Sequence, residues 1–234
     1  MVISYKEYYE AWGSLAQKLW SDTSRLDYQA DVWYNKNRNQ IVSDMIGARW
    51  DGLDVLANGT GHGIHQWADN EVLAGIKAKK VVKTDIIGGE GVDVVCDACS
   101  LPFEDESFDA VLCREVIEHV PKDYDLAWEA RRVLRSGGWL MLTTPNGYNC
   151  LPNGKDHVRA YSPYNFIDMV EHFRFKVVEK RGNLPNVVRS LLPLSYDGNK
   201  GILGEFQKLA ELWEKVEESY YFGGELYILC QKEL

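Results

Sequence analysis

Five short apolar runs alternate with helical or turn-like segments through the middle of the chain. The runs are GLDVLA (52–57), KVVKTD (80–85), VDVVC (92–96), FDAVLC (108–113) and WLMLTT (139–144). Continuous apolar runs are typical of strands buried on both faces, as in parallel α/β sheets. The segment LAWEARRVLRSGG has helical spacing and is expected to stop at Gly137 and Gly138. The pattern predicts an α/β, doubly wound, mostly parallel sheet.

Both flanks of this region extend the pattern. Apolar residues at helical spacing predict an amphipathic helix over 4–20, and a second helix is expected over 37–48. Strand-like runs follow later, RFKVVEK (174–180) and ELYILCQKE (225–233), separated by a helical insert around 206–216. No linker or repeat is visible, so we expect a single domain over 1–234. Its parts are a helical N-terminal cap (1–50), a central core (51–182), and a helical insert with the last strand (183–234).

One connection is unusually short. Only IIGGEG separates the second apolar run from the third, whereas a crossover between parallel strands usually takes a dozen or more residues. The third strand is therefore irregular, or the crossover helix is absent.

Composition narrows the choice of partners. The 234 residues are 45% hydrophobic and 26% charged, which is ordinary for a folded protein, and the net charge of −9 disfavours nucleic acid and anionic membranes. No apolar stretch is long enough to span a bilayer, and MVISYKEYYE lacks the apolar region of a signal peptide, so the cytoplasm is the expected compartment. Five cysteines without framework spacing indicate free thiols. Nothing indicates an oligomeric state.

A glycine turn and two carboxylates stand at the ends of predicted strands. The run ANGTGHG follows the first strand, where a backbone must turn tightly and approach a ligand. Asp85 ends the second strand 24 positions after Gly61, and a carboxylate there can accept both hydroxyls of a ribose. Asp97 ends the third run, where it would accept a purine amine. A plain strand-to-helix turn and solvated aspartates are the alternatives.

The ordered set of these segments resembles a known family. ANGTGHG, KTD, VDVVCDACSLPFEDESFDAVLCREVIEHVP, RRVLRSGGWLMLTTPNG and HVRAYSP closely resemble the class I S-adenosylmethionine-dependent methyltransferases, particularly the small-molecule "type 11" group. The resemblance covers about residues 50–182, and LPFEDESFDAVLCREVIEHV is its most specific part. It implies a Rossmann-like seven-stranded sheet ending in an antiparallel hairpin, and S-adenosylmethionine as the cofactor.

The resemblance also implies a cofactor site. The glycine turn would hold the methionine portion, Asp85 the ribose and Asp97 the adenine, with further residues lining the cofactor. The full set of implied cofactor-binding residues is Ala57, Asn58, Gly59, Gly61, Asp85, Ile86, Asp97, Ala98, Cys113 and Arg114.

The first strand departs from the family pattern. Members usually carry an acidic residue in this strand shortly before the first glycine, but Val55 and Ala57 stand here. Asp54 is one residue early, and in a strand that slip points its side chain to the opposite face. This departure bears directly on cofactor affinity.

Methyl transfer is an in-line displacement, so alignment of the groups and exclusion of water matter more than reactive side chains. A hydroxyl nucleophile would still benefit from a general base, and His119 and His157 are the candidates. For each, a histidine satisfied by backbone or packing is the alternative.

Four other residues are candidates for the substrate side. The aromatic rings of Trp33 and Tyr34 would form part of a lid over the cofactor sulfonium, or belong to the core. Arg159 and Tyr161 lie in HVRAYSP, which resembles the family's substrate-side segment, and the guanidinium would bind an acceptor carboxylate or phosphate. A solvated arginine is the alternative.

No metal site is expected from the cysteines. Cys96 and Cys99 have CxxC spacing, but zinc would need two further ligands. A redox motif should open a helix, whereas Leu101 and Pro102 indicate a turn.

Three functions compete. The favoured prediction is a methyltransferase acting on an oxygen or nitrogen of a small-molecule acceptor. A nicotinamide-dependent oxidoreductase would need a third glycine where Ile64 stands. A catalytically inactive methyltransferase-like binding or scaffold protein is the remaining alternative, because Val55 and Ala57 replace the acidic residue.

Overall fold

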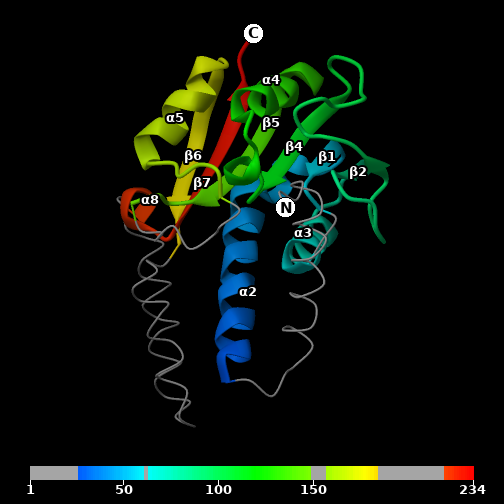
Figure 1. Cartoon of the computed structure of the whole chain (residues 1–234). Helices are drawn as coiled ribbons and strands as arrows, with labels where there is room; N and C mark the ends of the chain where they lie inside the picture. The colour runs from blue at the N-terminus through cyan, green and yellow to red at the C-terminus, as the bar shows by residue number, and fades with distance from the viewer. Residues whose placement is uncertain (1–25, 61–62, 149–156, 184–218) are drawn as a thin grey trace, which may run out of the picture.

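A computed structural model describes residues 26–60, 63–148, 157–183 and 219–234 (Figure 1). Within these ranges, residues 26–34 and 63–68 are described by their backbone alone, as are 219 and 222. The predicted helix over 4–20 and the predicted helical insert around 206–216 lie outside the described residues. The division into cap, core and insert stays a prediction.

Seven strands form one sheet in the order β3-β2-β1-β4-β5-β7-β6. From β3 to β5 all neighbouring strands are parallel, whereas β7 runs antiparallel to both β5 and β6. The predicted seven-stranded, mostly parallel sheet with an antiparallel C-terminal hairpin is therefore confirmed. The strands are β1 (Asp54–Asn58), β2 (Lys80–Asp85), β3 (Val94–Val95), β4 (Phe108–Arg114), β5 (Leu134–Pro145), β6 (Phe175–Gly182) and β7 (Glu225–Lys232).

Helices cover both faces of the sheet. They are α2 (Leu26–Ile46), η1 (Gly47–Trp50), α3 (Gly63–Gly75), η2 (Ile117–His119), α4 (Asp123–Val133), α5 (Pro163–His172) and α8 (Ser219–Phe222). The second predicted helix is confirmed as α2, although it begins earlier than expected. Among the described residues, none of these helices has the length and apolar character required to cross a membrane.

The predicted stop of α4 was wrong. The helix ends at Val133 and β5 begins at Leu134, so Gly137 and Gly138 lie inside the strand. The reason is strand pairing: Leu134 already faces Phe108 of β4 in register, before an irregularity in the ladder. Gly137 has a positive φ of 75°, which favours glycine in this irregular start of the strand.

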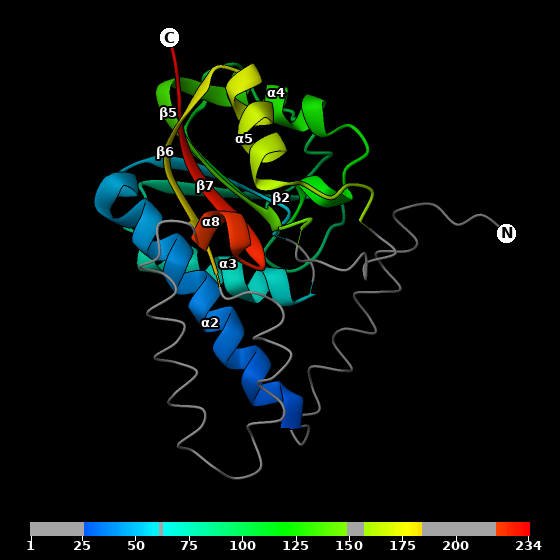
Figure 2. The same cartoon turned by 90° about the vertical axis from the view of Figure 1, so that its left-hand side faces the viewer.

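The core has two layers, one on each face. On one face, α4, α5 and α8 pack on residues that include Val111 and Cys113 of β4. On the other face, α2, η1 and α3 pack on residues that include Leu112. Figure 2 shows the sheet between these two groups of helices, with α2 extending well beyond it. Because side chains alternate along a strand, Arg114 belongs to the α2 and α3 face and Cys113 to the opposite one.

The short connection between β2 and β3 has no crossover helix, and β3 itself is irregular; the sequence predicted one or the other. Residues 86–93 join β2 to β3 without a helix, and β3 has only two residues paired with Thr84 and Asp85. Side chains organise this link instead, because Asp93 Oδ2 accepts a hydrogen bond from Lys83 N at 2.8 Å.

Candidate active site

The carboxyl ends of β1, β2 and β4 lie side by side. Asn58 at the end of β1 faces Thr84 of β2 on one side and Cys113 of β4 on the other. The segments that follow these three strands therefore meet at one edge of the sheet, where ligands bind in open α/β folds. We refer to it as the carboxyl edge.

The first glycine of the turn has no room for a side chain. Gly59 has a φ of 77°, and its amide donates to Thr84 O at 2.8 Å. A Cβ at this position would overlap Val116 Cγ2, just beyond β4. The turn is thus pressed against the segment that follows β4. Gly61 lies outside the described residues.

The residues before Gly59 are buried and differ in character. Asn58 Oδ1 accepts a hydrogen bond from Thr84 Oγ1 at 2.7 Å, while Asn58 Nδ2 is buried without a partner among the described residues. A buried donor without a partner is costly, so this amide fits a ligand acceptor at the turn. Ala57 is fully buried against the α2 and α3 side and offers no side-chain polar atom.

Both predicted cofactor carboxylates are held by backbone amides two residues further on. Asp85 Oδ1 accepts from Ile87 N at 2.9 Å, and Asp97 Oδ1 accepts from Cys99 N at 2.8 Å. Asp85 is half-buried, Asp97 is exposed, and Ile86 beside Asp85 is exposed. Ala98 is half-buried next to Asp97. These side chains lie along the carboxyl edge, as expected, and their contacts with a cofactor stay predictions.

The CxxC pair has raised pKa values. Partial burial, followed by the charge of Asp97, raises the pKa of Cys99 to about 12, and burial also raises the pKa of Cys96. Because the thiolate is the reactive form, the raised pKa values make these thiols poor nucleophiles at neutral pH.

Arg114 joins a buried network under α2 and α3. Its Nη1 donates to Asp69 Oδ1 and its Nη2 to Asn39 Oδ1, both at 3.0 Å, and Asn39 Nδ2 donates to Glu71 Oε2 at 2.6 Å. Burial raises the pKa of Asp69 to about 6, although Arg114 opposes the shift. The guanidinium thus anchors two helices to the end of β4, while Cys113 is buried on the opposite face.

A second buried network, missed by the sequence analysis, centres on Arg38 of α2. Its Nη2 lies 3.0 Å from Glu115 Oε2, and its Nε lies 2.8 Å from Glu225 Oε2. Glu225 Oε2 also accepts hydrogen bonds from Asn183 Nδ2 at 2.9 Å and from the Tyr227 hydroxyl. Burial raises the pKa of Glu115 to about 7; Arg38 lowers it and Glu225 raises it. This network joins α2 to the ends of β4, β6 and β7.

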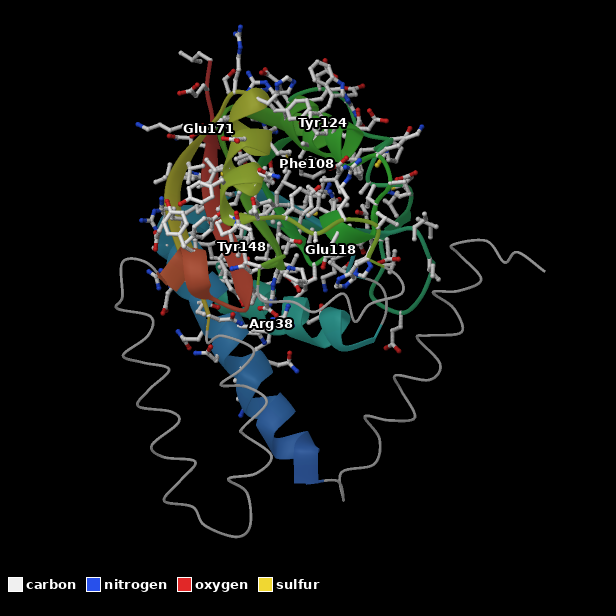
Figure 3. All side chains as sticks on the ribbon, turned by 60° about the vertical axis from the view of Figure 1, so that its left-hand side comes forward. Arg38, Phe108, Glu118, Tyr124, Tyr148 and Glu171 are labelled. Carbon is white, nitrogen blue, oxygen red and sulfur yellow. The ribbon has the colours of Figure 1, made fainter. Side chains whose placement is uncertain are left out.

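The two candidate histidines come together beside a buried carboxylate. The rings of His119 and His157 are 4.7 Å apart, centroid to centroid, at 79°. Glu118 is 1% exposed, and its Oε1 lies 3.7 Å from His119 Nε2. Burial, followed by the charge of Glu115, raises the pKa of Glu118 well above its usual value. Figure 3 shows Glu118 and Arg38 near the end of the sheet from which α2 extends.

The backbone of the loop after β5 is hydrogen-bonded to the main chain of Glu118. The amides of Val158 and Arg159 donate to Glu118 O at 2.8 and 3.2 Å. The Arg159 side chain turns to Asp123, with Nε 2.8 Å from Oδ2, and the Tyr161 hydroxyl donates to the same oxygen at 2.6 Å. Arg159 and Tyr161 therefore anchor the first turn of α4, and substrate contact stays a prediction for both. Trp33 and Tyr34 lie in α2, where only the backbone is described.

Residues 56–142 match the family described as "Methyltransferase domain". This segment runs from β1 through β5 and includes Gly59, Asp85, Asp97 and the Glu118–His119 pair. The match and the fold support a class I S-adenosylmethionine-dependent methyltransferase domain over these residues. The cofactor of this class I domain is S-adenosylmethionine.

Similar proteins agree with the methyltransferase domain. A relative from Mycolicibacterium smegmatis, named "Probable S-adenosylmethionine-dependent methyltransferase", is 27% identical over 173 residues, which are 66% of this chain and 63% of that protein. A relative of the same name from Mycobacterium tuberculosis is 32% identical over 136 residues, covering 54% of this chain and 47% of that protein. The chain thus spans less than two thirds of the length of these relatives. In fold, Haemonchus contortus phosphoethanolamine N-methyltransferase 2, solved with S-adenosyl-L-methionine, has a TM-score of 0.61 at 15% identity, covering 100% of this chain and 61% of that chain.

Proposed function

We propose that this protein transfers a methyl group from S-adenosylmethionine to an oxygen or nitrogen of a small-molecule acceptor. The observation that carries the proposal is the turn at Gly59. Gly59 has no space for a Cβ and lies against Val116. Asp85 stands at the end of β2, the strand beside the one that leads into this turn. A backbone turn beside a carboxylate at this edge suits a nucleoside with a polar tail.

In this proposal the cofactor lies over the carboxyl ends of β1, β2 and β4. The Asn58 amide, which has no partner among the described residues, binds the methionine portion together with the turn at Gly59. Asp85 binds the ribose and Asp97 the adenine. The proposed cofactor-binding residues are Ala57, Asn58, Gly59, Gly61, Asp85, Ile86, Asp97, Ala98, Cys113 and Arg114.

The acceptor is proposed to lie beyond the cofactor, near η2 and the loop after β5. His119 and His157 are the titratable pair on that side, and we assign them the activation of an acceptor hydroxyl or amine. Trp33, Tyr34, Arg159 and Tyr161 complete the proposed acceptor side. Most of the rate enhancement would come from alignment of the nucleophile, the methyl carbon and the sulfur.

Calorimetric titration with S-adenosylmethionine and S-adenosylhomocysteine tests the proposal, with NAD as the control ligand. Both sulfur compounds should bind and NAD should not. Binding of NAD alone would overturn the proposal. If none of the three binds, an inactive scaffold becomes the better description, and the apolar Ala57 is its physical reason.

A matched pair of variants tests the ribose assignment. Asp85→Asn keeps an oxygen for Ile87 N but removes the carboxylate, so S-adenosylmethionine affinity should fall about 10- to 100-fold through loss of charged hydrogen bonds. Asp93→Asn is the control, because Asp93 also binds a backbone amide, that of Lys83, in the same connection. Equal affinity in the two variants would remove the assignment of Asp85.

We also propose a cytoplasmic setting and a single domain. The free thiols of Cys96, Cys99, Cys113 and Cys230 support the cytoplasmic setting, and the single sheet that contains β1 to β7 supports the single domain.

A further inference from the structure

Three metal-ligating side chains converge where η2 meets the loop after β5. Ligand atoms of Glu118, His119 and His157 all lie within 4.8 Å of one another. Two of the residues are buried and His157 is half-buried, so the group has one side toward the surface. The three residues come from two segments far apart in the sequence.

The carboxylate in this group is incompletely satisfied. Glu118 Oε2 accepts a hydrogen bond from Thr144 Oγ1 at 3.3 Å. Glu118 Oε1 has less than 1 Å² exposed and accepts no hydrogen bond in the described part of the chain, and its nearest cationic candidate is His119 Nε2 at 3.7 Å. A buried carboxylate oxygen in this state is costly unless a cation or donor reaches it.

The surrounding structure holds the ligands in place. The Thr144 hydroxyl fixes one oxygen of Glu118, and the main-chain oxygen of Glu118 binds the amides of Val158 and Arg159, next to His157. The amide of His119 donates to Val116 O at 3.0 Å. Such supporting hydrogen bonds are what orient the ligands of known metal sites.

We propose that Glu118, His119 and His157 bind one divalent first-row transition-metal ion, of which Zn²⁺ is the typical example. Two imidazoles and one carboxylate suit such an ion, and three protein ligands leave a coordination position open. The separations fit this after a small closure of the side chains, because tetrahedral ligands at about 2.0–2.1 Å from zinc lie closer together than 4.8 Å.

The open position has a consequence that rests on the proposed methyl transfer. Val116, two residues before Glu118, abuts Gly59 in the glycine turn, so the ion would lie on the acceptor side of the cofactor. A hydroxyl oxygen of the acceptor bound there would lose its proton near neutral pH more readily than the free hydroxyl. The two histidines would then activate the acceptor through the ion.

Cobalt tests the site directly, because Co²⁺ is coloured and replaces Zn²⁺ in sites of this kind. The full chain is freed of metal with a chelator and titrated with Co²⁺ while its visible absorption is recorded, and Zn²⁺ is then added as a competitor. We expect saturation at one equivalent and loss of the spectrum on adding Zn²⁺. Failure to saturate at one equivalent would overturn the proposal.

Variants locate the binding. His157→Ala removes a half-buried ligand with little expected loss of stability, and Co²⁺ affinity should fall at least 10-fold, as should that of His119→Ala and Glu118→Gln. His172→Ala is the control, because His172 is exposed on α5 outside the group, and it should bind as the wild type does. Unchanged Co²⁺ affinity in His157→Ala would also overturn the proposal, whether or not Glu118→Gln folds.

Titration of the same samples with S-adenosylmethionine separates this proposal from the proposed function. Cofactor binding without cobalt binding removes the metal site and leaves the methyltransferase proposal standing. Cobalt binding without cofactor binding does the reverse: it supports the metal site and counts against methyl transfer.

Discussion

Two arginines, at opposite ends of the sheet, each pair with two carboxylates in different surroundings. At the amino edge, Arg135 Nη1 lies 2.7 Å from Asp109 Oδ1 and 3.6 Å from Asp54 Oδ2, with its side chain 42% exposed. At the carboxyl edge, Arg38 bridges Glu115 and Glu225 with its side chain 8% exposed.

The difference shows where the fold accepts an energetic cost. Exposed ion pairs are screened by water and contribute little, whereas buried ones lose the hydration of every charge and repay it only with good geometry. Of these two groups of ion pairs, the exposed one lies at the amino edge, where no ligand is expected, and the buried one lies at the carboxyl edge, where the cofactor is proposed to bind.

Removing each arginine should give the largest contrast. Arg38→Met leaves Glu115 and Glu225 buried without their cation and should lower the free energy of unfolding by about 3–5 kcal/mol. Arg135→Met should lower it by no more than about 1 kcal/mol. Urea unfolding of the two variants beside the wild type measures both, and similar losses would show that burial does not separate the two edges.

Two glycines give the next contrast. Gly59→Ala combines a left-handed backbone with overlap on Val116, so we expect a loss of about 3 kcal/mol together with loss of S-adenosylmethionine binding. Gly137→Ala, at the amino edge with an equally positive φ but open space around it, should cost only about 1 kcal/mol and leave cofactor binding intact. Thermal unfolding and calorimetry distinguish the two variants. Cofactor binding that survives in Gly59→Ala would contradict the assignment of the turn.

Two aspartates should respond to pH in opposite directions. The folded-state pKa of Asp69, about 6, is above its unfolded value, so the folded protein holds this proton longer and stability falls as pH rises from about 4 to about 6. One pKa unit corresponds to about 1.4 kcal/mol, so the rise of this pKa from about 4 to about 6 corresponds to no more than about 3 kcal/mol.

Asp109 at the amino edge behaves in the opposite way. Partial burial raises its pKa, but the Asp54 amide and Arg135 outweigh this and hold the pKa below its usual value. Ionised Asp109 stabilises the folded protein above about pH 4, and this contribution is lost as pH falls through the pKa of Asp109 in the folded state. The free energy of unfolding of Asp69→Asn and Asp109→Asn is to be measured across pH 3–7. Asp69→Asn should lose the decrease in stability as pH rises from about 4 to about 6, and Asp109→Asn should lose the decrease as pH falls below about 4. The same change of slope in both variants would contradict the comparison.

The sheet was predictable because its strands are short apolar runs that need no distant partner to be recognised. All seven runs became strands. The short connection before Val94 predicted an irregular third strand or a missing crossover helix, and the structure has both features. The glycine turn and Asp85 were found for the same reason, because each is a local signal at the end of a strand.

The buried charges were not predictable in this way. Arg38 and Asn39 are polar residues in a polar stretch, and their burial is tolerable because partners distant in the sequence meet them. Arg38 pairs with Glu115 and Glu225, and Asn39 hydrogen-bonds to Arg114 and Glu71. The start of α2 was also placed too late, and its described buried residues are polar before Ile41 (Asn35, Arg38 and Asn39) and apolar from Ile41 onward. The meeting of Glu118 with His157 likewise depends on how the loop after β5 folds back.

The position of β7 has a consequence for how the chain is made. This strand lies between β5 and β6, so β6, although synthesised earlier, has no place in the sheet until residues 225–232 have emerged from the ribosome. Until then the outer side of β5 is an unpaired edge, open to pairing with other chains. A stalled or shortened product that ends before residue 225 would therefore be a candidate for aggregation and for chaperone binding, even though β1 to β5 are complete.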